Sequence, residues 1–126
     1  MNNTLKTTLT TTQVAERFNE LAQQEKWFEI QDEFFADDIK SIEPATSPYF
    51  KNAEGKSAVR KKGEGFVQQI TAAHQLTTTA PIVNGNHFAV GRTTDIDVNG
   101  FGRIKIDQIM LYEVKDGQII SEQFFY

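Results

Sequence analysis

The chain has 126 residues, of which 39% are hydrophobic and 24% are charged. This length and composition suit one globular domain with a sizeable core and argue against two. The formal net charge of -4 argues against a dedicated nucleic-acid-binding protein, which usually carries a basic excess. Because the chain contains no cysteine, the sequence excludes disulfides, thiol nucleophiles and thiolate metal sites.

Residues 1–12 are rich in asparagine and threonine and contain no apolar run. We therefore expect a flexible polar tail, not a signal peptide, followed by one folded domain over residues 13–126. No stretch of the sequence is long and apolar enough to span a membrane, so we expect a cytoplasmic protein.

Hydrophobic residues recur at helical spacing in three stretches of the N-terminal half. The first helix is expected to be capped by Thr12, the second to begin near Trp27 and to be closed by Asp37-Asp38, and the third to open at Ser57. Their expected inward positions are Val14, Phe18, Leu21 and Ala22; Trp27, Ile30 and Phe34; and Val59, Phe66, Val67 and Ile70. A short strand over Ile39–Glu43 should end at Pro44, because proline cannot donate to a strand ladder.

Three turn dipeptides divide the stretch from His74 to Tyr126 into antiparallel strands. Asn84-Gly85, Asn99-Gly100 and Asp116-Gly117 supply the positive φ angles that tight hairpins need. Because side chains alternate across a strand, two mostly apolar sets each mark one face. The sets are Phe88, Val90, Arg92, Thr94, Ile96 and Val98, and Ile104, Ile106, Gln108, Met110, Tyr112 and Val114. Arg92 and Gln108 interrupt these apolar faces and therefore indicate a site.

The order of these elements predicts an α+β protein. Two helices, a short strand and a third helix precede about four long strands. We expect a cone-shaped, curved antiparallel sheet whose concave face is covered by the three helices.

Several motifs resemble one known superfamily. Phe35-Ala36-Asp37-Asp38, followed four residues later by Glu43-Pro44, is similar to the helix end and first strand of nuclear-transport-factor-2-like proteins. The stretch 112–120 resembles the closing hairpin of SnoaL-type polyketide cyclases. The resemblance implies a cystatin-like α+β barrel, a homodimer that pairs through the convex sheet face, and no cofactor.

The resemblance to ketosteroid isomerases implies roles for particular residues. Glu43 stands where those enzymes carry a carboxylate that acts as general base. Phe18 and Met110 stand where they carry a tyrosine and an acid that bind the oxyanion, and neither side chain can replace those donors. A shifted alignment would place Asp107 at the second position, on the face opposite the apolar set. Steroid isomerase activity itself is therefore not expected.

Alternation along the strands predicts a pocket on the concave face. Its predicted polar members are Glu43, Arg92, Gln108, Glu122 and Tyr126, with Phe124 and Trp27 as apolar walls. The resemblance adds Phe18 and Met110 as further ligand contacts. Glu43 is the predicted catalytic base, because burial brings the pKa of a carboxyl group nearer to working pH. Arg92 is predicted to bind an anionic group, and Gln108 to donate to a carbonyl or enolate oxygen during catalysis.

Each of these residues also has a purely structural interpretation. Arg92 could simply neutralise Glu43 or Glu122, since an unpaired buried charge is costly. Glu43 could face solvent, because an error of one residue in strand register reverses every side chain. Tyr126, Phe124 and Trp27 could belong to the core or its rim.

Other motifs carry weaker signals. The motif Asp95-x-Asp97-x-Asn99-Gly100 resembles the start of a calcium loop, but Ile106 replaces the bidentate glutamate. His74 and His87 lie on different predicted strands, so we expect no metal site. The run Arg60-Lys61-Lys62 is expected to form a solvated helix face.

The sequence therefore leaves two functional hypotheses. The first is a protein that binds a small, partly apolar carbonyl compound and, if it is an enzyme, transfers a proton as an isomerase, cyclase or dehydratase without a cofactor. The second is a non-catalytic ligand-binding or dimeric interaction module. Exposed apolar residues at Ile109, Leu111, Ile119 and Phe125 favour a homodimer, and no nucleic-acid or membrane partner is expected.

Overall fold

Two helices begin the part of the chain that the computed structural model describes, residues 8–126. They are α1 (Thr11–Ala22) and α2 (Trp27–Phe34). Thr10 caps α1: its hydroxyl accepts from the Gln13 N–H, and the Gln13 side chain accepts from the Thr10 N–H. The predicted cap at Thr12 is therefore wrong by two residues. Residues 1–7 of the predicted tail lie outside the described residues.

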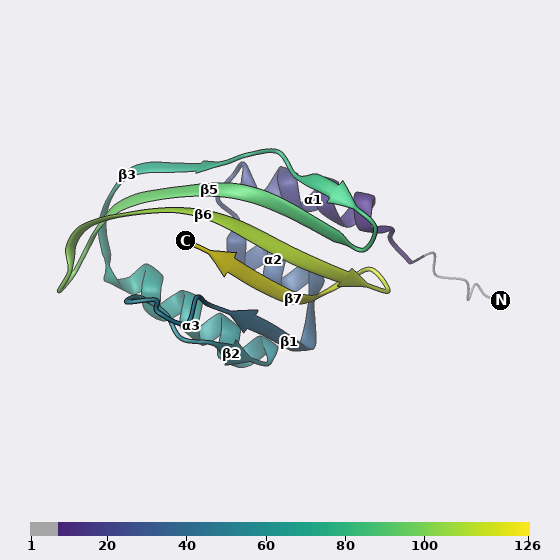
Figure 1. The fold of residues 1–126 in the computed structure, drawn as a ribbon, viewed down its shortest axis with the longest axis horizontal. Helices are drawn as coiled ribbons and strands as arrows, with labels where there is room; N and C mark the ends of the chain where they lie inside the picture. The colour runs from purple at the N-terminus through teal and green to yellow at the C-terminus, as the bar shows by residue number, and fades with distance from the viewer. Residues whose placement is uncertain (1–7) are drawn as a thin grey trace.

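Seven strands form one curved sheet, with β5 and β6 running along its length (Figure 1). The strands are β1 (Phe35–Ile42), β2 (Ala53–Glu54), β3 (Ile70–Thr78), β4 (Ile82–Asn84), β5 (His87–Val98), β6 (Gly102–Lys115) and β7 (Gln118–Phe125). Their order is β2-β1-β7-β6-β5-β3, and β4 pairs with β5. The predicted α+β class is confirmed. The sheet is mixed, because β1 and β7 run parallel, and it is open, because its edge strands β2 and β3 do not pair with each other.

The three predicted hairpin turns are confirmed. At the β6–β7 turn, Lys115 pairs with Gln118, and Asp116 and Gly117 have φ angles of 52° and 75°. Two successive positive φ angles are the geometry that matches the twist of the flanking strands. The turns after β4 and β5 likewise contain Gly85 and Gly100 at positive φ.

The third helix, α3 (Lys56–Gln69), begins differently from the prediction. Its N-cap is Gly55, with φ 93° and no side-chain cap, so Ser57 does not open the helix. Gly55 can turn the chain sharply here, and its N–H donates to the Ile39 carbonyl at 2.8 Å. Val67 is exposed and Ile70 already belongs to β3, which corrects two of the predicted inward positions.

The first strand also begins earlier than predicted. β1 starts at Phe35, directly after α2, and not at Ile39. Asp37 and Asp38 are exposed residues within β1 and do not end a helix.

The helices cover the concave side of the sheet in two groups (Figure 1). α1 and α2 pack over one end, where Phe18, Phe88 and Tyr112 lie in the larger core cluster. α3 lies over the other end, where Phe66 packs against a small cluster of Ile96, Val98, Ile104 and Ile106.

Ile119 does not lie on the convex face as predicted. It is fully buried, because an irregularity in the β6–β7 register between Glu113 and Val114 reverses the facing of the residues beyond it.

Candidate functional site

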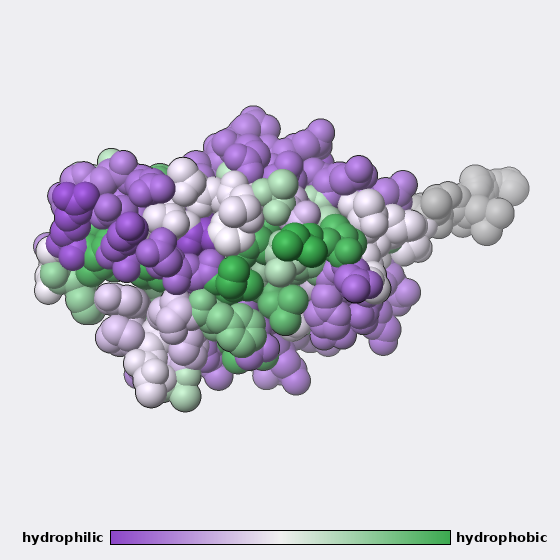
Figure 2. Space-filling model, turned by 45° about the horizontal axis from the view of Figure 1, so that its top comes forward, coloured by the Kyte–Doolittle hydropathy of each residue, from purple (hydrophilic) through white to green (hydrophobic). Residues whose placement is uncertain are grey.

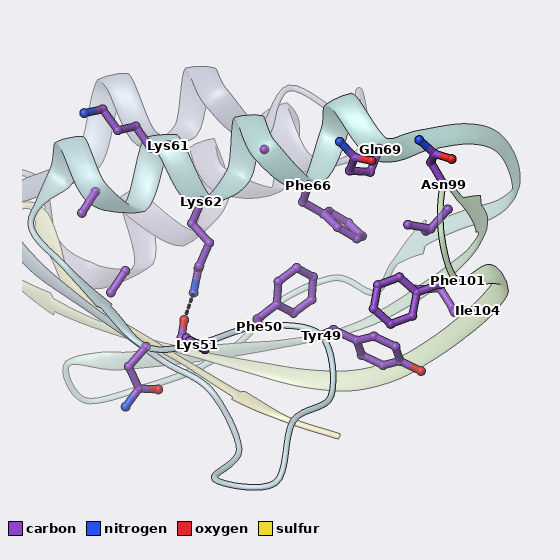
Figure 3. A pocket seen from close by; sticks show the side chains of 15 residues that line it. Tyr49, Phe50, Lys51, Lys61, Lys62, Phe66, Gln69, Asn99, Phe101 and Ile104 are labelled. Atoms are coloured by element: carbon purple, nitrogen blue, oxygen red, sulfur yellow. Dashed lines mark hydrogen bonds between the residues drawn. The ribbon is translucent and has the colours of Figure 1, made fainter.

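A cavity of about 640 Å³ opens between α3, the loop after β1 and the tip of the β5–β6 hairpin. Four aromatic rings line it (Figure 3): Phe66 points down from α3 toward Phe50, and Tyr49 and Phe101 stand beside them. The ring centroids of Phe50 and Phe66 are 4.8 Å apart, and those of Tyr49 and Phe101 are 5.9 Å apart. An aromatic cavity of this size suits a small ligand with an apolar body.

Lys62 is the charged side chain that connects this cavity to the interior. Its ammonium group donates to Glu43 Oε2 at 2.8 Å, to Ser41 Oγ at 2.8 Å and to the Lys51 carbonyl at 3.2 Å. The side chain of Lys62 is 20% exposed and that of Glu43 only 4%. Lys62 lines the cavity, and Glu43 lies one contact behind it. The pair is therefore shielded from solvent screening, unlike an ordinary surface ion pair.

Tyr126 holds the second oxygen of the same carboxylate. Its hydroxyl donates to Glu43 Oε1 at 2.8 Å, so the Ser47 hydroxyl, 2.5 Å away, must donate to Tyr126. The pKa of Tyr126 is raised to about 12, mainly by burial. The Glu43 carboxylate also raises this pKa, and the hydrogen bond with Ser47 lowers it. Tyr126 consequently keeps its proton at neutral pH and acts as a donor.

Ser47 orders the loop that carries two of the cavity rings. Its hydroxyl oxygen accepts from the backbone N–H groups of Tyr49 and Phe50 at 3.2 and 3.1 Å. The Glu43 backbone N–H is bound by the Asn52 side chain at 2.7 Å, at the other end of the loop. The network around Glu43 thus extends into the wall of the cavity.

Glu122 is a second buried carboxyl group beside this network. It lies on β7 opposite Ser41 of β1. The pKa of Glu122 is raised to about 7, mainly by burial. Ser41 and the charge of Lys62 lower this pKa, and the nearby Glu43 carboxylate raises it. The site therefore contains two carboxyl groups around one ammonium group.

Four of the predicted site residues gather around Lys62. They are Glu43, Glu122, Tyr126 and Phe124, whose ring centroid lies 5.6 Å from the Lys62 ammonium nitrogen. Their predicted functional roles stay predictions.

Arg92 lies elsewhere, and the convergence of Glu43, Arg92 and Gln108 predicted from the sequence is not formed. The Arg92 guanidinium donates to both oxygens of Glu25, at 2.7 and 2.8 Å, and lies 4.8 Å above the Trp27 ring. The carboxylate partner is therefore Glu25, from the turn between α1 and α2, and neither Glu43 nor Glu122. Burial raises the pKa of Glu25, but the hydrogen bonds from Arg92 and Trp27 outweigh it and lower that pKa overall.

Gln108 accompanies Arg92. The two residues are opposite one another on β5 and β6, and both line a second cavity of about 250 Å³.

Phe18 and Met110 lie in the packed core. Phe18 is fully buried against the rings of Trp27, Phe88 and Tyr112. Met110 Sδ accepts a weak hydrogen bond from the Tyr112 hydroxyl at 3.8 Å. Neither residue lines the 640 Å³ cavity.

Sequence reasoning missed Lys62, Ser41, Ser47 and the aromatic wall. The prediction of a solvated helix face is wrong for Lys62, which lies on the same side of α3 as Val59 and Phe66. A spacing of three residues to Val59 and four to Phe66 is the signal that could have identified it.

Among residues 8–126, no cluster of three or more His, Cys, Asp or Glu side chains could hold a metal ion. The helices of this same range include none that is long and apolar enough to cross a membrane.

The fold and the cavity define a class of protein: α+β domains in which helices cover the concave face of a curved sheet and leave an apolar cavity at one end. The sequence matches the SnoaL-like domain family over residues 9–126, and the chain belongs to this family. A comparison with curated proteins finds no match.

Solved structures agree with this assignment. One is a Mesorhizobium loti protein that is 32% identical to this chain, with a TM-score of 0.86. Its provisional name is SnoaL-like polyketide cyclase, with carbohydrate phosphatase in brackets. The match covers 94% of this chain and 100% of that one.

Two more distant structures show the fold alone. A protein from Xanthomonas campestris with a cystatin-like fold has a TM-score of 0.68, 15% identity and coverage of 93% of this chain and 90% of that one. A protein from Catenulispora acidiphila with a ketosteroid isomerase-like fold, in complex with trimethylamine, has a TM-score of 0.68 at 16% identity, covering 93% and 87%.

Proposed function

We propose that the protein binds a small carbonyl compound with an apolar body and moves a proton on it, as an isomerase, cyclase or dehydratase does. The observation that carries this proposal is the Glu43 carboxylate, which is held by Tyr126 and by Lys62, and Lys62 in turn lines the aromatic cavity. The cavity would take the apolar body, and the Lys62 end would take the carbonyl group. Membership of the SnoaL-like family and the polyketide cyclase name of the Mesorhizobium loti protein support this choice.

The proposed reaction begins with proton transfer to Glu43. Glu43 accepts a proton from the carbon next to the carbonyl group, and the electron pair of that C–H bond passes to the carbonyl oxygen as an enolate. The Lys62 ammonium group stabilises the enolate oxygen by a charge-assisted hydrogen bond. Glu43 then returns the proton to the product. Lys62 thus takes the role that the sequence assigned to Gln108, and the scheme uses no cofactor.

One observation favours the alternative, a ligand-binding module without catalysis. Both oxygens of Glu43 already accept hydrogen bonds, one from Lys62 and one from Tyr126. A ligand must displace one of these donors before Glu43 can accept its proton. If neither Lys62 nor Tyr126 is displaced, the protein binds the ligand without catalysing a reaction.

Hydrogen–deuterium exchange of 1-tetralone separates the two functions. This bicyclic ketone carries exchangeable protons beside its carbonyl group, and proton NMR in D₂O follows their loss. We expect the wild-type protein to accelerate the exchange and Glu43→Gln to reduce it by about 10² to 10⁴-fold, the usual contribution of a general base. Binding of 1-tetralone, followed by chemical-shift titration, should change little.

Glu64→Gln is the matched control, because Glu64 is an exposed carboxylate on α3. It should leave exchange and binding unchanged. Equal exchange by wild type and Glu43→Gln would refute Glu43 as the base. Binding of 1-tetralone without any exchange above buffer would favour the non-catalytic module.

We also propose that the convex sheet face forms a homodimer. Figure 2 shows hydrophobic side chains gathered near the middle of the molecule in this view. On this face Ile109 and Phe125 pair across β6 and β7 and are 51% and 48% exposed, and Ile82 of β4 is 78% exposed. Such a patch favours a partner surface of the same kind. Multi-angle light scattering should give a dimer mass for the wild type and a monomer mass for Ile109→Lys. A monomeric wild type would refute the proposal.

A further inference from the structure

Glu122 is a buried carboxyl group that the proposed reaction does not use. It is 7% exposed and lies between Ser41 on β1 and Tyr112 on β6, which are its neighbours in the strand register. An unpaired charge at such a depth would be costly. The surroundings of Glu122 therefore determine whether it is ionised.

A continuous chain of contacts joins Glu122 to Glu43. The Ser41 hydroxyl accepts from the Lys62 ammonium at 2.8 Å, so its own proton is free to point toward Glu122, its register partner on β7. Ser41 accordingly lowers the pKa of Glu122. The same ammonium donates to Glu43 at 2.8 Å. Its third donor goes to the Lys51 carbonyl, so no donor of Lys62 is left over.

We propose that Glu122 is a positioning residue for Glu43, acting through Ser41 and Lys62. When Glu122 is neutral, Glu43 is the one carboxylate paired with the Lys62 ammonium, and this pairing reduces the tendency of Glu43 to accept a proton. When Glu122 is ionised, the two carboxylates compete for one cation, and Glu43 becomes freer to accept a proton. The consequence for catalysis rests on the proposed function, whereas the coupling between the two carboxyl groups does not.

The charged and titratable groups around Glu122 place this change near neutral pH. Lys62 faces it from α3, Glu43 from the position directly after β1 and the Tyr112 hydroxyl from β6, and Arg92 of β5 also acts on Tyr112. Burial is the largest influence and raises the pKa of Glu122 to about 7. The geometry of the shared cation is what transmits this titration to Glu43.

Carboxyl-carbon NMR of the isotope-labelled protein tests the coupling without any ligand. In the wild type, the Glu122 signal should titrate near neutral pH, and the Glu43 signal should move with the same midpoint. Glu122→Gln should remove that movement, Glu122→Asp should restore it in part, and Glu64→Gln should not affect it. A Glu43 signal that does not respond while Glu122 titrates would overturn the proposal.

Ser41→Ala provides a second test that keeps both carboxyl groups, in case Glu122→Gln does not fold. Removing the Ser41 hydroxyl should raise the Glu122 midpoint and weaken the response of Glu43. Unchanged midpoints and an unchanged response would contradict the contact chain.

The pH dependence of 1-tetralone exchange tests the catalytic consequence separately. Exchange by the wild type should rise about tenfold through neutral pH, since one nearby charge changes the proton affinity of a carboxylate by roughly that factor or more. Exchange by Glu122→Gln should be flat over the same range, and a wild-type rise retained in this variant would overturn the positioning role. If no variant exchanges 1-tetralone, the proposed catalysis is wrong, while the NMR titration still decides the coupling.

Discussion

The two ends of the sheet are covered in different ways. At one end, α1 and α2 together bury Phe18 completely among aromatic rings whose centroids lie 4.7 to 5.7 Å from its own. At the other end, α3 and a loop leave Phe50 and Phe66 half-buried around a cavity of about 640 Å³. The two helices fill the concave face at the first end, whereas the single helix and the loop leave a cavity at the second end. The filled end should therefore determine stability and the hollow end ligand binding.

Phe18→Ala should have the largest effect on stability. Removing a fully buried aromatic ring is expected to lower the free energy of unfolding by about 3 to 5 kcal/mol, because it loses apolar burial and leaves a void. Urea denaturation followed by circular dichroism measures this loss. A loss of unfolding free energy as small as that expected for a half-buried ring would contradict the assignment of stability to the filled end.

Glu122 should make stability depend on pH. Its pKa is about 7 in the folded protein, above the ordinary value of 4.5, so the folded state holds this proton more tightly than the unfolded state. Stability should fall as pH rises from about 4.5 to about 7, by roughly 3 kcal/mol at about 1.4 kcal/mol per unit.

Urea denaturation across this pH range measures the slope. Glu122→Gln should remove it, because glutamine does not titrate. Glu25 has a lowered pKa, so its contribution to stability is lost only at lower pH and does not obscure the fall expected from Glu122. A wild type as stable at pH 7 as at pH 5 would contradict this assignment.

Arg92→Met should have a smaller effect. The Arg92 side chain is 10% exposed and makes two hydrogen bonds to Glu25, which is itself partly solvated. We expect the free energy of unfolding to fall by about 1 to 2 kcal/mol, since the remaining carboxylate can recover water. Arg92→Lys should not restore it fully, because lysine cannot form the two-pronged contact. Binding of 1-tetralone should be unchanged, and weakened binding would place Arg92 in the ligand site.

Phe66→Ala should have the smallest effect on stability and a clear effect on binding. The ring is half-buried and faces the cavity, so its loss should lower the free energy of unfolding by about 1 kcal/mol. The affinity for 1-tetralone should fall about tenfold, which corresponds to about 1.4 kcal/mol of binding free energy. Chemical-shift titration measures this change. Unchanged affinity would mean that the ligand binds elsewhere.

Local signals explain why much of the fold could be predicted. Asp116-Gly117 forms its hairpin because the requirement for positive φ is met by those two residues themselves. The alternation along β5 and β6 also places Phe88 and Tyr112 in the core as expected. The bulge near Val114 is different, because it depends on how β6 and β7 pair, and it carried Ile119 to the opposite face from the one predicted.

The site could be predicted only in part, because its contacts join distant elements. Glu43, Glu122 and Tyr126 follow from strand alternation, and they do gather in one place. The partners of the charged groups do not follow from it. Glu25 reaches Arg92 from a turn 67 residues away, and Lys62 reaches Glu43 from a helix 19 residues away.

The sequence by itself determined the hairpins, the faces of the long strands and the α+β class, because each depends on residues that are near one another in the chain. Only the tertiary structure decided which cation meets which carboxylate and which end of the sheet stays hollow. Those outcomes depend on where α1, α2 and α3 rest on the sheet and on how far their long side chains reach, and neither is encoded in the spacing of residues along one element.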